Sequence, residues 1–208
     1  MKKRIATVHA LLVTALLATA CQTDGTGTTS SSETAGRAPG MVEQAETNAF
    51  VDRGLAAKNP LDVAVLPIQQ PQGRRDVPID TLRRSFAEGL VKLRYSPLST
   101  EFVDERTVEA GYSPGSLSES AALEVVISYW DDTQWRTRGR IDVRAEVRML
   151  DSAKPAGPAL WGGPIQTTLL INTRGMRPTQ NMLEEACGQF VERVLGHLPP
   201  RRPDQAVP

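Results

Sequence analysis

The chain has few of the residues from which disulfide frameworks, metal centres and most catalytic sites are built. Its 208 residues include only two cysteines, Cys21 and Cys187, and two histidines. If Cys21 is modified, Cys187 has no partner within the chain, so no disulfide framework forms. His197, the one histidine beyond residue 20, lies next to a pair of prolines and is a poor candidate for a general base. These shortages exclude a disulfide-stabilised fold and disfavour histidine-based catalysis.

Sequence motifs of catalysis and of cofactor binding are also missing. The chain contains no Walker loop, dinucleotide-binding glycine pattern, nucleophile elbow or metal-ligand spacing. Asp131 and Asp132 directly follow an apolar run, where adjacent acids more often form a solvated turn than a cation site. Cys187 falls on the apolar stripe of a predicted helix, which favours a buried small side chain over a nucleophile. We therefore expect a protein that is no enzyme and that holds no cofactor and no metal.

The charge balance of the chain disfavours a further class of function. Lys+Arg and Asp+Glu both number 24, but residues 1–20 hold three basic residues and no acid. Without this segment the chain has 21 basic and 24 acidic residues, a formal charge of −3. Bulk binding of nucleic acid needs a basic surface, so we expect no nucleic-acid partner.

The first twenty residues have the pattern of an export signal. Lys2, Lys3 and Arg4 precede an apolar run over 6–20 that is too short to span a bilayer comfortably. Residues 17–21, Leu-Ala-Thr-Ala-Cys, resemble a lipobox, with Ala18 at the usual place of leucine. The resemblance implies cleavage after a signal peptide of residues 1–20 and lipidation of Cys21. The alternative is an ordinary secretory signal cut near Ala20.

Residues 21–58 are predicted to connect the lipid to a folded domain. Residues 22–40 are rich in Gly, Thr and Ser without apolar periodicity, so they form a flexible tether with a span of roughly 25 Å. A short helix within 41–58 would end at Asn59 and Pro60. Gln22 follows the cysteine, and the resemblance to enterobacterial lipoproteins implies sorting to the periplasmic face of the outer membrane. Acyl chains, palmitate among them, would then bind the protein to the membrane.

Residues 59–198 have the periodicity of one α/β domain, and 199–208 form a polar tail. Apolar runs predict strands at 62–68, 94–98 and 123–130. Apolar stripes predict a helix capped by Asp80 and running to about 94, a second from Thr100 or Asp104 to 110, and a third from Thr179 or Asn181 to Gly196. Residues 135–149 alternate and predict a long strand, with an antiparallel partner at 160–171 that is kinked or bulged at 162–164. We expect a mixed sheet of about five strands with a long hairpin and with helices packed on it.

The alternating segment places five arginines on one predicted strand face. This face could meet an anionic glycan, a lipid or an acidic partner. The competing interpretation is a solvated or edge-protecting face, and Asp142 and Glu146 already dilute its charge. The candidate partner-binding residues are Arg136, Arg138, Arg140, Arg144 and Arg148.

Several short segments together resemble a known family. They are Asn59-Pro60 before the Val63–Pro67 strand, residues 95–98 (Tyr-Ser-Pro-Leu), 103–105 (Val-Asp-Glu), 125–127 (Val-Val-Ile) and 160–162 (Leu-Trp-Gly). In this order they resemble the neisserial-type periplasmic lipoproteins, related at fold level to the CsgG, LpoB and TolB N-terminal-like domains. The resemblance implies a noncatalytic envelope module that binds a protein partner or assembles into a homo-oligomer. The alternative is a subunit of an oligomeric secretion or surface-structure export complex.

Overall fold

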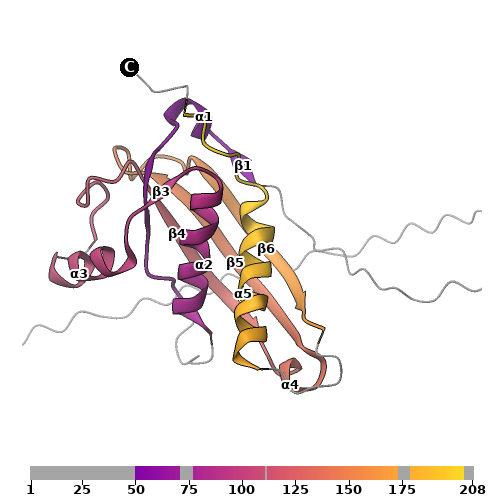
Figure 1. The fold of residues 1–208 in the computed structure, drawn as a ribbon. Coiled ribbons are helices and arrows are strands. Elements are labelled where there is room, and N and C mark those ends of the chain that lie inside the picture. Colours follow the sequence, from indigo (N-terminus) through magenta and orange to yellow (C-terminus); the bar gives the residue numbers. More distant parts are fainter. Residues whose placement is uncertain (1–49, 71–76, 111, 173–178, 204–208) are drawn as a thin grey trace, which may run out of the picture. The chain divides into compact units, whose positions relative to one another are not determined.

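The computed structural model describes residues 50–70, 77–110, 112–172 and 179–203, so Cys21 and the predicted tether up to residue 49 lie outside it. The described part confirms a single α/β domain with a mixed sheet (Figure 1). The elements in chain order are β1 Val51–Asp52, α1 Leu55–Lys58, β2 Asp62–Val65, α2 Ile79–Lys92, β3 Ser96–Pro97, α3 Thr100–Ala110, β4 Ala121–Asp131, α4 Trp135–Arg138, β5 Arg140–Asp151, β6 Trp161–Leu170 and α5 Gln180–Leu195.

The sheet has a parallel part and an antiparallel part, in the order β1-β6-β5-β4-β2-β3. Strand β2 runs parallel to both β3 and β4, because the intervening chain returns through α2 and α3. Strands β4, β5 and β6 form an antiparallel meander, and the short β1 pairs antiparallel with the first two residues of β6. The long hairpin expected from the sequence is therefore present as β5 and β6.

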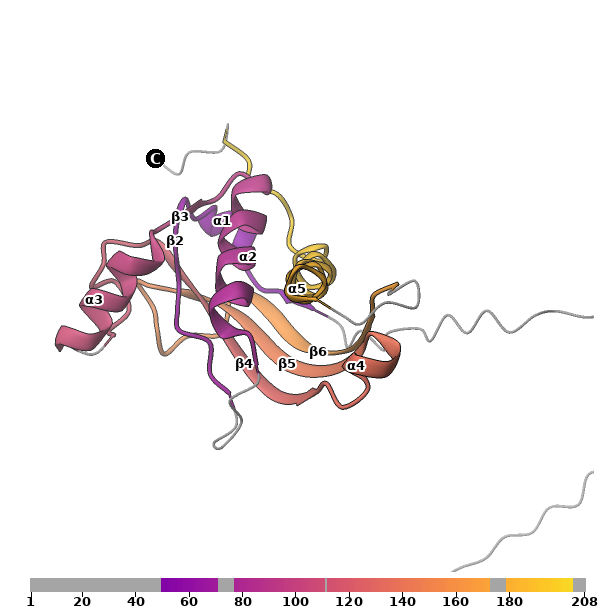
Figure 2. The same cartoon turned by 60° about the horizontal axis from the view of Figure 1, so that its bottom comes forward.

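The two longest helices cover one face of this sheet. Figure 2 shows α2 and α5 side by side above the strands, with α3 on the other side near β2. Beneath α2 and α5 the apolar residues of each strand alternate into one core, where the rings of Phe86 and Phe190 meet edge to face with centroids 6.2 Å apart. Ala64, Val103 and Leu117 form a small second cluster beneath α3. No described helix covers the outer face of β4, β5 and β6.

Two expectations about the hairpin were wrong, the second only in part. Residues 135–138 form the helical turn α4 instead of continuing the strand, because Trp135 packs on the core and Gly139 ends the turn in a left-handed conformation with φ 62°. Of the expected kink or bulge at 162–164, the bulge is absent, since β5 and β6 pair without a break from Arg140 to Met149, but the backbone is irregular at Gly162, where φ is 145°. The bulge occurs in β4 instead, between Ile127 and Tyr129.

The segment before β2 also differs from the expectation of a helix within a tether. In its described part, residues 50–58, the helix is reduced to α1, and Asp52 accepts hydrogen bonds from the backbone N–H groups of Gly54 and Leu55. The Phe50 ring stacks on the Trp161 ring, with centroids 4.9 Å apart. Lys58 forms an ion pair with Asp151 at 2.9 Å. Within the described residues, Phe50 and Lys58 thus connect this segment to the rest of the domain.

The last helix begins as one of the two sequence alternatives predicts. The Thr179 hydroxyl accepts a hydrogen bond from the backbone N–H of Met182, so Thr179 rather than Asn181 is the N-cap of α5. Helix α2 begins at Ile79 after Pro78, and Asp80 lies in its first turn instead of capping it. The expected 94–98 strand is shortened to β3, because Arg94 takes a left-handed conformation with φ 68°.

Candidate binding face of the sheet

The described helices leave the outer face of the three long strands uncovered. Its side chains alternate with those of the core, as the burial of each strand shows. We call this surface the open face. It consists of Glu124, Val126, Ser128, Tyr129 and Asp131 of β4, Arg140, Asp142, Arg144, Glu146 and Arg148 of β5, and Pro164, Gln166, Thr168 and Leu170 of β6.

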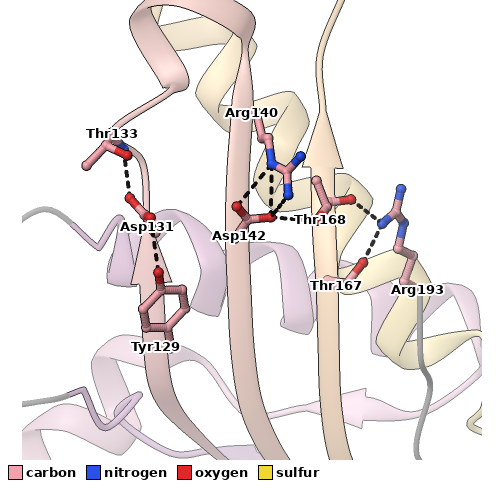
Figure 3. Close-up of polar contacts among 8 residues, drawn as sticks. All are labelled: Tyr129, Asp131, Thr133, Arg140, Asp142, Thr167, Thr168 and Arg193. Atoms are coloured by element: carbon pink, nitrogen blue, oxygen red, sulfur yellow. Dashed lines mark hydrogen bonds and ion pairs between the residues drawn. The ribbon is translucent and has the colours of Figure 1, made fainter. Parts of the chain in front are cut away.

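At one end of the open face Asp142 is the centre of a polar cluster (Figure 3). Arg140 donates from Nε to both carboxylate oxygens, at 3.2 and 3.0 Å, and the Thr168 hydroxyl donates to the same group. Burial raises the pKa of Asp142, but these hydrogen bonds outweigh it and leave that pKa below its usual value. The carboxylate therefore stays ionised and its charge is met by Arg140.

At the other end Arg148 is held in a similar way. Its Nη2 and Nε lie 2.6 and 3.0 Å from Oε2 of Glu124, and its Nε lies 3.7 Å from Oε1 of Glu146. The Glu124 side chain is 17 % exposed, whereas that of Glu146 is 52 % exposed. Compared with Glu124, Glu146 thus has the weaker ion pair with Arg148 and the more exposed side chain.

Between these clusters Arg144 lies across the ring of Tyr129. The Cζ atom of Arg144 is 5.2 Å from the ring centroid, within the range of a cation–π contact. The bulge before Tyr129 turns this ring outward, and its hydroxyl donates to Oδ2 of Asp131 at 3.0 Å. Among the described residues no carboxylate lies within ion-pair distance of Arg144. Arg144 is therefore the arginine of β5 that is available to a partner.

The structure divides the five candidate arginines into two groups. Arg136 and Arg138 are exposed on α4, whereas the other three lie on β5. Within β5, Arg140 and Arg148 are engaged with acids of the same domain, as described above. The alternation that seemed to run through all five breaks at Gly139, where the chain changes from helix to strand. Their partner-binding role stays a prediction.

Neither candidate for catalysis lies in a reactive setting. Cys187 is fully buried in α5, and burial raises its pKa to about 12. The ring of His197 is stacked on that of Phe50, with centroids 4.8 Å apart, and its backbone carbonyl accepts a hydrogen bond from Nε1 of Trp161. Among the described residues no group of three His, Cys, Asp or Glu side chains could hold a metal ion.

We expect the Cys187 thiol to be nearly inert while the domain is folded. In a Cys21→Ala chain, where it is the only thiol, alkylation should be at least roughly 100-fold slower in buffer than in denaturant, because reaction needs an opening of the core. Pulsed labelling followed by intact-mass measurement gives both rates. Labelling of the folded chain at the denatured rate would contradict the buried position.

One polar centre of the domain was missed by the sequence analysis. The buried carboxylate of Glu119 accepts four hydrogen bonds, from the Tyr112 and Ser152 hydroxyls and from the backbone N–H groups of Gly115 and Leu117. It fixes the loop before β4 against the turn after β5. In the sequence it is one acid in a Ser- and Gly-containing segment, and no local pattern distinguishes it from a solvated residue.

None of the helices in the described ranges is long and apolar enough to cross a membrane.

No protein-family model and no curated protein matches the chain. Solved structures with a similar fold include the PelC dodecamer from Paraburkholderia phytofirmans, with 14 % identity, a TM-score of 0.49 and coverage of 74 % of this chain and 97 % of that one. A lipoprotein, GNA1162 from Neisseria meningitidis, matches at 18 % identity and a TM-score of 0.45, covering 67 % and 99 %. A DUF4136 family protein from Bacteroides thetaiotaomicron matches at 10 % identity and a TM-score of 0.38, covering 73 % and 96 %.

A lipoprotein of the expected neisserial kind is thus among the similar structures. These matches concern the arrangement of helices and strands, and at such identities they carry no information about the partner or the site. The expected relation to the CsgG, LpoB and TolB N-terminal-like domains stays a prediction.

Proposed function

We propose that the chain is a noncatalytic lipoprotein of the bacterial envelope that binds a protein partner through the open face. Cys21 would carry the lipid and hold the protein at the periplasmic face of the outer membrane. The observation that carries the binding role is the row formed by Tyr129, Arg144 and Gln166, which pair across three adjacent strands. Tyrosine and arginine are the residue types most often found at the energetic centre of interfaces. A sheet holds them in fixed positions, which lowers the entropy lost on binding.

The two edges of the sheet support binding through the face. At one edge, β3 pairs only with Asp62 and Val63 of β2. The carbonyl of Val65, farther along β2, accepts hydrogen bonds from Nε and Nη2 of Arg83, at 3.0 and 2.9 Å. At the other edge, β1 pairs only with Trp161 and Gly162 of β6. Farther along β6, the carbonyl of Thr168 accepts a hydrogen bond from Nη1 of Arg193 at 2.6 Å, and Pro164 has no backbone N–H to donate to an added strand. Arginines of α2 and α5 therefore occupy edge carbonyls that an added strand would need.

The setting of Cys187 and His197 supports a role without catalysis. A nucleophilic thiol needs a lowered pKa and access to substrate. The pKa of Cys187 is instead raised, and its side chain is buried. The His197 ring lies against Phe50, a position in which it stabilises the contact between the start of the domain and the end of α5.

The anchor is tested by the mass and location of the full chain. We expect the wild-type chain in membrane extracts to carry acyl chains and to fractionate with the outer membrane, and Cys21→Ala to lose both properties, because the thiol is the acylation site. Intact-protein mass spectrometry and membrane fractionation measure this. An unmodified Cys21 in a soluble protein would refute the anchor.

The binding role is tested in the same cells by crosslinking. Arg144→Ala should reduce the yield of the crosslinked partner, whereas Arg84→Ala should not, because Arg84 is an exposed arginine of α2, in the helix layer on the other side of the sheet. Equal yields from the two variants would count against the open face as the binding surface.

A further inference from the structure

The charges of β5 on the open face form a pattern that is complementary to itself. The four around its centre are Asp142, Arg144, Glu146 and Arg148, placed evenly on both sides of Ala145, and Arg140 beyond them is paired with Asp142 at 3.0 Å. If the strand is turned end for end about Ala145, Arg144 exchanges places with Glu146, and Asp142 exchanges places with Arg148. Each of these four charges then faces a charge of opposite sign. A two-fold symmetric interface requires this property, because each of its contacts is made twice.

The neighbouring strands extend this pattern. Ala145 pairs with Ile127 of β4 and with Ile165 of β6, so the three residues form a row across the sheet. On one side of this row lie Val126, Glu146 and Pro164, and on the other side lie Ser128 with Tyr129, Arg144 and Gln166. A two-fold axis along the central row places each side of one copy against the other side of its partner. Val126 would then meet Tyr129, and Pro164 would meet Gln166.

We infer that the partner of the open face is a second copy of this chain, docked face to face about a two-fold axis over Ala145. The inference rests on the proposed binding role of that face. Its central contacts join Arg144 of each copy to Glu146 of the other. Packed sheets lie about 10 Å apart, and extended arginine and glutamate side chains together span this separation.

The local geometry favours these two residues as the contact. Arg144 has no carboxylate within ion-pair distance among the described residues, and Glu146 is 3.7 Å from Arg148, which is already held by Glu124 at 2.6 Å. A depression of about 310 Å³ lies over the same place, lined by the symmetric pairs Val126 and Ser128, Arg144 and Glu146, and Pro164 and Gln166. This space would receive the long side chains of the second copy.

The balance of charge distinguishes a second copy from a polyanion. Three arginines of the open face, Arg140, Arg144 and Arg148, stand among four acids, Glu124, Asp131, Asp142 and Glu146. An anionic glycan or an acidic segment would meet these acids as well as the arginines, whereas a second copy places the four central charges of β5 against charges of opposite sign. At the rim Glu124 would lie across from Asp131, and each is engaged within its own copy, by Arg148 and by Tyr129.

The test uses charge reversal on both sides of Ala145 in the full chain. Arg144→Glu would place glutamate against Glu146 of the second copy, and Glu146→Arg would place arginine against Arg144. Each single variant should raise the dimer dissociation constant by roughly tenfold or more. The double variant should restore dimers, and a mixture of the two single variants should form heterodimers. Sedimentation equilibrium in density-matched detergent measures these constants, with Arg84→Glu as the control on α2.

Heterodimers in the mixture would also show that the single variants are folded. A wild-type chain that is monomeric at tens of micromolar, or single variants that dimerise like the wild type, would overturn the inference. Capture of a different envelope protein through Arg144 by a monomeric chain would overturn it too, while leaving the proposed binding function in place. A chain that neither dimerises nor loses any partner on Arg144→Ala would refute both.

Discussion

Replacement of Gly162 by alanine is expected to destabilise the domain by about 3 kcal/mol or more. Gly162 has φ 145°, a conformation that side chains other than glycine rarely adopt. A Cβ atom there would lie 2.2 Å from the carbonyl oxygen of Val147 and 2.8 Å from Cα of Arg148. Both are backbone atoms of the neighbouring strand, so no side-chain rotation relieves the contact. The midpoint and slope of urea unfolding measure the loss.

Gly188→Ala is the matched control for this substitution. Gly188 lies within α5, and a Cβ atom there would meet nothing within 4 Å. Because alanine is the better helix former, this variant should be more stable than the wild type by roughly 0.5–1 kcal/mol. Equal urea midpoints for Gly162→Ala and Gly188→Ala would contradict the predicted clash of a Cβ atom at position 162 with the backbone of β5.

Glu119→Ala is expected to cost about 3 kcal/mol, because it removes the acceptor of four hydrogen bonds at once. The N–H of Leu117 would then remain in a buried place without the carboxylate oxygen that now lies 2.9 Å away. Urea unfolding of the full chain measures this cost. Ser118→Ala, at the exposed neighbouring position, is the control and should change the free energy of unfolding by less than about 0.5 kcal/mol. Equal losses in the two variants would contradict the role of the carboxylate.

The same carboxylate should make the stability depend on pH. Burial raises the pKa of Glu119, but hydrogen bonds from Tyr112, Gly115 and Leu117 outweigh burial and leave its pKa below the usual 4.5. The folded domain thus binds this proton less readily than the unfolded chain does. The resulting stability is complete above the unfolded pKa and is lost as the pH falls through the folded pKa. Glu119→Gln should flatten this dependence below about pH 5, and an unchanged profile would contradict it.

The position of the bulge in β4 shows how one backbone irregularity shapes the candidate site. If β4 were regular, with no bulge between Ile127 and Tyr129, strict alternation would place Tyr129 on the same face as Ile127, in the core. With it, both Ser128 and Tyr129 are exposed and Trp130 enters the core. The alternation of apolar residues could not locate this bulge, because the run from Leu123 to Trp130 is apolar at nearly every position. Contact between Tyr129 and Arg144 therefore could not be predicted.

The arginines of the long hairpin show a similar limit. Their spacing predicted one charged strand face, and from Arg140 onward that prediction agrees with β5. Which of them is free depends on acids that neighbour it in space, such as Glu124, which lies 24 positions from Arg148 in the chain. Strand register decides these pairs, and register depends on the whole sheet. The sequence therefore showed a charged surface but not that Arg144 is its available cation.

What the sequence by itself determined is the local order of the domain. Apolar residues at a spacing of two or of about 3.6 are set by the geometry of the strand and of the helix, so β4, β5, α2 and α5 follow from neighbouring residues. The N-cap at Thr179 and the antiparallel hairpin belong to the same class. Only the tertiary structure decided that residues 135–138 turn as a helix, that Glu119 is a buried centre, and that β1 joins the sheet. These outcomes depend on contacts between residues far apart in the chain, such as Phe50 and Trp161. The periodicity of neighbouring residues does not predict such contacts.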